Sequence, residues 1–181
     1  MLSQARSAPR RARLLGLVAA LGLAIGCEGV GRDRAPVPRN DVEFIDDMIP
    51  HHEGAVVMVD EVLARGDSND VRRIAEKIKE NELAEIEHMR SLRAELGESE
   101  EPKRKAQDPQ MKADMSDLHS LYGEPLDDQF LRDMIAHHAQ GVTMIHRARP
   151  NLQSEKTRET ADTSFVQKTR EMYELVELLA E

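Results

Sequence analysis

The chain has 181 residues, of which 34 are acidic, 25 are Lys or Arg, nine are Met, one is Cys and 3% are aromatic. A single Cys excludes a disulfide framework and a Cys-based zinc site, and a formal charge of −9 argues against binding to nucleic acid phosphates. The length indicates one domain or two small ones. Many methionines beside few aromatics are notable, because Met fills cores and is also a soft metal ligand.

Residues 1–26 have the features of an export signal. Four arginines and no acid precede an apolar run at 14–25, which is shorter than the roughly 20 residues that span a bilayer. Gly26-Cys27 resembles the bacterial lipobox, which predicts acylation of Cys27 and a lipid-anchored protein in the periplasm or another extracytoplasmic compartment. A plain secretory signal is the alternative. Without residues 1–26, 21 bases face 34 acids, a formal charge of −13.

The remaining chain divides into a tether and one domain. Residues 27–40 contain Gly and Pro and few apolar residues, which predicts a flexible tether, and the domain covers 41–181. Within the domain, the charged segment 97–110 contains two prolines and is predicted to link two halves, 41–96 and 111–181.

The two halves are related in sequence. Residues 44–58 and 130–144 share eight identities in fifteen positions at a constant offset of 86, and the same offset pairs Glu85 with Glu171. A repeated pair of helices predicts an all-α fold, a ferritin-like four-helix bundle built from a duplicated helical hairpin.

Apolar periodicity predicts where these helices lie. The first ends at Gly66 and the second, capped by Asp67 or Ser68, ends near residue 96; the last two cover about 127–149 and 160–181, after a short helix at 111–122. Pro50 conflicts with a helix interior, because it removes a donor and clashes with the preceding turn. Either the first helix kinks at Pro50, which the apolar spacing before it favours, or it begins there after an extended segment.

The repeated motif Asp-Met-Ile-x-His-His-(x)5-Met carries the predicted chemistry. Asp47 and His51, like Met48 and His52, are four residues apart and therefore lie about 6 Å from each other on one side of a helix. Imidazole and thioether ligands without Cys favour copper, Cu(I) in particular, and leave iron and zinc as alternatives. The predicted metal ligands are Met48, His51, His52, Met58, Met134, His137, His138 and Met144.

A second set of residues is predicted to orient these ligands or to add to them. Several of these residues have an alternative role that involves no metal. The methionines suit an apolar core, and Glu82 and Glu85 suit ion pairs with Arg across the bundle. His88 is predicted to face solvent. The set consists of Asp47, Asp133, Glu82, Glu85, Met89, Met111, Met115 and His119.

The paired Phe-x-x-x-Met-Ile-x-His-His-x-x-x-Val segments and the Glu85-Ile86-x-x-Met89 ending of the second helix resemble domain of unknown function family 305, over roughly residues 41–181. This family comprises ferritin-like helical bundles that include periplasmic copper-binding proteins of the CopM type. The resemblance implies a secreted or lipid-anchored bundle, with copper bound by His and Met in some members. This chain departs from the pattern at Lys168 and Leu175, which stand where Glu82 and Met89 stand in the first half and indicate an asymmetric site.

Three functions are consistent with the sequence. The first is a cell-envelope protein that binds or buffers copper, with a metal ion and a lipid bilayer as its partners and no protein partner assigned. The second is a di-iron carboxylate oxidase, because Glu85-x-x-His88 imitates a ferritin-like ligand pair. The third is a structural or interaction module whose histidines only form hydrogen bonds. No nucleophile or phosphate-binding loop is present, so no catalytic residue is predicted and a non-enzymatic role is favoured.

Overall fold

The computed structural model describes residues 37–98 and 118–180. The predicted export signal, Cys27, most of the tether, Met111 and Met115 lie outside the described residues. Within these two ranges the chain forms helices and no strand, so the predicted all-α fold is confirmed. A helical turn at 118–120 precedes the helix that begins at Glu124. The other elements are α1 (Asp41–Arg65), α2 (Asn69–Glu95), α4 (Glu124–Ala148), the 3-10 helix η1 (Arg149–Asn151) and α5 (Glu155–Leu179).

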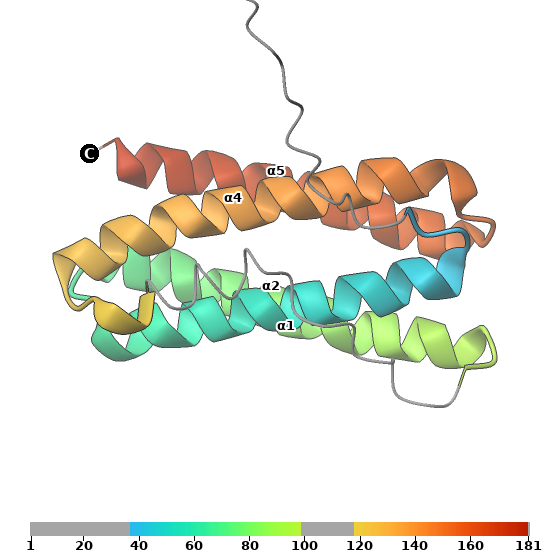
Figure 1. The fold of residues 1–181 in the computed structure, drawn as a ribbon, viewed down its shortest axis with the longest axis horizontal. Coiled ribbons are helices and arrows are strands. Elements are labelled where there is room, and N and C mark those ends of the chain that lie inside the picture. The colour runs from blue at the N-terminus through green and yellow to red at the C-terminus, as the bar shows by residue number, and fades with distance from the viewer. Residues whose placement is uncertain (1–36, 99–117, 181) are drawn as a thin grey trace, which may run out of the picture. The chain divides into compact units, whose positions relative to one another are not determined.

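The four long helices form two hairpins (Figure 1). α1 packs along α2 and α4 packs along α5, and the hairpins meet through α1 against α4 and α2 against α5. Each helix therefore contacts two others and turns one side toward the axis of the bundle. None of the described helices is long and apolar enough to cross a membrane.

Serine side chains cap the starts of α2 and α5. The Ser68 side chain accepts from the backbone of residue 71 at the start of α2, and the Ser154 side chain accepts from residue 157 at the start of α5. Both turns are also held from the other hairpin. The Asp127 carboxylate accepts from the amides of residues 67 and 68 at 3.0 and 2.8 Å, and the Asp41 carboxylate accepts from those of residues 153 and 154 at 3.2 and 3.0 Å.

The structure decides between the two alternatives at Pro50 and corrects the predicted start of the last helix. α1 is continuous from Asp41 through Pro50, so a helix that begins at Pro50 is excluded. α5 begins at Glu155 rather than near residue 160. Its first turn is mostly polar and gives little apolar periodicity, whereas the Ser154 cap fixes the start.

The bundle interior has two apolar clusters with a polar layer between them. One cluster combines Met58 and Val62 of α1 with Phe130 of α4 and their neighbours on α2. The other combines residues 44–49 of α1 with residues 86–92 of α2 and the C-terminal part of α4. On each of the four helices, one group of buried polar residues falls between these clusters in the sequence: 51–52, 82, 137–138 and 164–171. Apolar packing above and below therefore fixes a layer of histidine, glutamate and lysine side chains.

Candidate metal centre

Every long helix contributes side chains to the polar layer. α1 and α4 each supply a His-His pair, and α2 and α5 supply the charged groups that face them. All but one of these side chains are buried, and Glu85, the exception, is partly exposed. The layer consists of His51, His52, Glu82, Glu85, His137, His138, Lys168 and Glu171.

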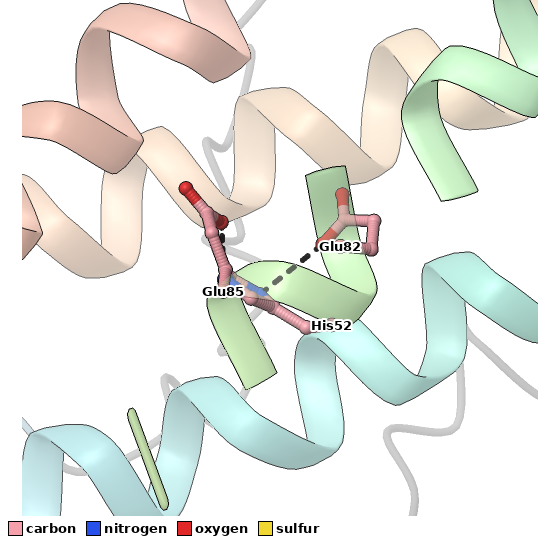
Figure 2. A group of neighbouring side chains, drawn as sticks. All are labelled: His52, Glu82 and Glu85. Atoms are coloured by element: carbon pink, nitrogen blue, oxygen red, sulfur yellow. Dashed lines mark ion pairs between the residues drawn. The ribbon is translucent and has the colours of Figure 1, made fainter. Parts of the chain in front are cut away.

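His52 lies between two carboxylates of α2 (Figure 2). Its Nε2 atom is 2.7 Å from Glu85 Oε2, and its Nδ1 atom is 3.6 Å from Glu82 Oε2. Glu82 and Glu85 are three residues apart and therefore project from the same side of α2. One imidazole and two carboxylates from adjacent helices thus converge in a buried space.

His138 has the corresponding place on α4. Its Nε2 atom donates to Glu171 Oε2 of α5 at 2.7 Å. The other oxygen, Glu171 Oε1, accepts from the Asn81 amide at 2.7 Å. A carboxylate held in this way fixes the orientation of the imidazole ring and leaves Nδ1 as its second polar atom.

Lys168 joins the two groups. Its ammonium lies 2.7 Å from Glu82 Oε1 and 3.1 Å from Glu85 Oε2, and its side chain is only 1% exposed. Burial disfavours the ammonium, but Glu82, Glu85 and Glu171 outweigh this effect and raise the pKa of Lys168. The lysine is therefore a charged group in the interior of the bundle.

Two carboxylates of this layer have lowered pKa values. Burial alone would raise the pKa of Glu85, but the His52 imidazole and the Lys168 ammonium lower it to about 2. Burial would also raise the pKa of Glu171, and His138 and Lys168 lower it in the same way. With neutral imidazoles, three carboxylates against one ammonium give this layer a formal charge of −2.

His51 and His137 form a separate pair beside this charged group. Their rings stack with centroids 3.9 Å apart and planes 10° from parallel, and His137 Nε2 donates to the His51 carbonyl at 3.1 Å. The stack needs Gly141, because a Cβ atom there would lie 2.9 Å from His51 Nε2. Burial, followed by the neighbouring imidazoles, lowers the pKa of His51 well below its usual value and that of His137 to about 3.

The donor atoms fit a transition-metal ion. Two overlapping groups, His52-Glu82-Glu85 and Glu82-His138-Glu171, each place three ligand atoms within 4.8 Å of one another, and Glu82 belongs to both. Among the described residues, His52 Nδ1, Glu82 Oε2 and His138 Nδ1 have no hydrogen-bond partner although they are buried. Buried polar atoms without a partner are costly, and a cation would satisfy them. Imidazole with carboxylate suits Cu(II), Zn(II) and iron.

A surface cavity leads toward this layer. It has a volume of about 560 Å³ and lies between α2 and α5. Glu85, the partly exposed carboxylate, lines it together with Asn81, His88 and Gln167. An ion entering from solvent would therefore meet Glu85 before the other ligands.

The predicted methionine ligands lie in or against the two apolar clusters. Met58 and Met134 belong to the first apolar cluster, Met48 and Met89 belong to the second, and Met144 packs against the second. Their participation in metal binding stays a prediction.

The other predicted residues lie at the edge of the polar layer or outside it. Asp47 and Asp133 are half-buried, and Asp133 accepts from Gln129 at 2.8 Å. His119 is exposed and pairs with Glu61, far along α1 from the two histidines. His88 is exposed, as predicted, and its ring bonds with Thr160 of α5. Among the described residues, Glu82 and Glu85 pair with a lysine rather than with the predicted arginine.

The predicted ligand set did not include two residues of the layer, Lys168 and Glu171. It also did not include Asn81, which donates to Glu171. The offset of 86 relates Glu171 to Glu85 and Lys168 to Glu82, so the repeat contained a signal for two of them. Nothing in the sequence signals Asn81, because its role depends on the contact between α2 and α5.

An all-α bundle with a buried His-carboxylate layer defines the class of this protein. The chain belongs to the DUF305 family, a domain of unknown function, whose family model matches residues 41–179. Among curated proteins, none matches the sequence at a significant level.

Solved structures of the family share the fold. A DUF305 fragment from Deinococcus radiodurans superposes with a TM-score of 0.71 at 22% identity, covering 80% of this chain and 98% of that one. A DUF305 protein from Streptomyces coelicolor, described in its name as secreted, gives a TM-score of 0.66 at 23% identity, covering 78% and 93%. CopM in its Cu(II)-bound form gives 0.67 at 23% identity, covering 78% and 96%, and CopM has also been solved with Cu(I) and with silver.

Proposed function

We propose that this chain is a cell-envelope metal-binding protein that binds and buffers copper at the His-carboxylate layer of its bundle. The observation that carries this proposal is the composition of the layer. Two imidazoles and three carboxylates converge from four helices, and the only cation among the described residues there is Lys168. A buried group with a formal charge of −2 binds a divalent ion favourably, because the ion neutralises the charge and supplies the missing partners.

Copper is supported as the ion on two grounds. CopM, which shares the fold, binds Cu(II), Cu(I) and silver. The donor set of the layer suits Cu(II), which accepts imidazole and carboxylate ligands, and zinc remains the main competitor. Binding of Cu(I) would draw on the soft thioethers of Met48, Met58, Met134 and Met144, which border the layer in the two apolar clusters.

Export is the second part of the proposal. The N-terminal signal and the Gly26-Cys27 junction support secretion with lipid anchoring through acylated Cys27, and one DUF305 structure is of a protein described as secreted. The bundle would then face a compartment where copper enters from outside. Mass spectrometry of the N-terminal peptide tests this part, since an unmodified Cys27 in the purified exported protein would contradict lipid anchoring.

Titration with Cu(II) and, under anaerobic conditions, with Cu(I) tests the metal site. We expect tight binding in the natural chain and a loss of at least about tenfold in affinity for His52→Ala/His138→Ala, because one imidazole of each ligand group is removed. His146→Ala is the matched control, because His146 is an exposed histidine of α4. Equal affinity in all three proteins would refute the proposed site.

A di-iron carboxylate centre is the second candidate function. The two ligand groups share Glu82, as a bridging carboxylate would require. The sequence signal behind this candidate, Glu85-x-x-His88, is not the source of the imidazoles, because His88 is exposed and His52 and His138 supply them. Iron reconstitution that yields two ions per chain and an oxo-bridged absorption band would establish this candidate, and the absence of that band would reject it.

A further inference from the structure

Lys168 stands where the first half of the chain has a carboxylate. At the offset of 86, His52 corresponds to His138, Glu85 to Glu171 and Glu82 to Lys168. The first half therefore supplies a complete His-Glu-Glu group, and the second half supplies His and Glu with an ammonium in place of the other Glu.

The second ligand group includes a carboxylate from the first half of the chain. Its three members are His138, Glu171 and Glu82, and Glu82 comes from the first group. The same Glu82 also contacts Lys168 through Oε1 at 2.7 Å, so one carboxylate serves both ligand groups and the ammonium. The ammonium is buried and lies against Glu85 as well, so it cannot leave the layer without exposing its charge to an apolar interior.

We propose that Lys168 is a built-in cation that takes the place of a second metal ion and limits the layer to one transition-metal ion per chain. This inference rests on the proposed function, because it assumes that the His-carboxylate layer binds a metal. Charge counting supports it. Three carboxylates and one ammonium are neutralised by one divalent ion, whereas a carboxylate at position 168 would give four negative charges and require two such ions.

Hydrogen bonds from other side chains orient the carboxylates around the lysine. The carboxylate that faces it from α2, Glu85, also accepts from Ser164 of α5 at 3.2 Å. On the other side, Glu171 is fixed by Asn81 and His138. The Glu85 carboxylate in contact with the ammonium and the Glu171 carboxylate of the same layer are therefore both held by other side chains. A lysine in this position makes an asymmetric centre from two similar halves.

The experiment counts Cu(II) ions by native mass spectrometry, with Cu(II) as the added metal. The His52→Ala/His138→Ala substitutions are also made in each of the proteins compared. Only the ions that these substitutions remove are counted, so that ions bound elsewhere in the chain are left out of the count. We expect one such ion in the natural chain, one in Lys168→Arg, which keeps the charge, and two in Lys168→Glu. One ion in both the natural chain and Lys168→Glu would overturn the inference and leave the proposed function intact.

Failure of the proposed function gives a different result from failure of this inference. No histidine-dependent ion in the natural chain but binding in Lys168→Glu would refute copper binding by the natural protein while supporting lysine as the blocking cation. Lys168→Gln covers the case in which Lys168→Glu does not fold, as judged by far-UV circular dichroism. It removes the ammonium without adding a ligand, and we expect at least about tenfold tighter binding of the first Cu(II). Unchanged affinity in Lys168→Gln would also overturn the inference.

Discussion

Acidification of the metal-free protein should destabilise it through the stacked histidines. In the folded chain the pKa of His137 is lowered to about 3 from an ordinary value of 6.5, so the imidazole stays neutral at pH 5. In the unfolded chain the same group is protonated at that pH. A group with a lowered folded pKa contributes its full stability above the unfolded pKa and loses it as the pH falls toward the folded one.

The magnitude follows from these two values. When the pH falls from 7 to 5, protonation of His137 in the unfolded chain lowers the free energy of unfolding by about 2 kcal/mol. His51 adds to the loss in the same direction, because burial lowers its pKa as well. Glu85 contributes little in this interval. Its pKa falls from 4.5 to about 2, so its stabilisation is lost only below about pH 4.5.

Urea unfolding followed by far-UV circular dichroism, in the presence of a chelator, measures the effect. We expect the difference in free energy of unfolding between pH 7 and pH 5 to shrink by about 2 kcal/mol in His137→Gln and to stay unchanged in His146→Gln, whose histidine is exposed. The comparison uses the difference between two pH values, so a general loss of stability in either variant cancels. An equal pH dependence in the natural chain and His137→Gln would refute the reasoning.

Three further substitutions test the packing and charge of the bundle by the same unfolding measurement. Asp127→Ala removes the acceptor of two backbone amides and should cost about 1–3 kcal/mol, with Asp127→Asn close to the natural value. Gly141→Ala should cost about 1–2 kcal/mol, because its methyl group would press on the stacked His51 ring; a gain from helix propensity alone would contradict this. Glu82→Ala should cost about 3–5 kcal/mol by depriving Lys168 of its nearest carboxylate, and a loss under about 1 kcal/mol would show that the remaining contact with Glu85 is enough to stabilise the ammonium.

The fold class and the positions of the two His-His pairs could be predicted from the sequence alone. Helical periodicity and the offset of 86 depend on residues close together in the chain or on a comparison of the chain with itself, so no tertiary information was needed. Export and acylation of Cys27 stay predictions, because Cys27 lies outside the described residues. The predicted start of α5 was wrong because its first turn is polar and gives no apolar periodicity. Ser154, a residue type that often caps helices, was the signal in the sequence for the correct start.

The groups that contact the histidines could be found only from the packing of the helices. Methionines were predicted as ligands beside the histidines, with Glu82 and Glu85 as possible further ligands, and the structure brings carboxylates of α2 and α5 to His52 and His138. Helical spacing shows which residues share a face, but which face of another helix meets it depends on how the hairpins pack. The pairing of Lys168 with Glu82 is such a contact, and it turns a repeated sequence into an asymmetric centre.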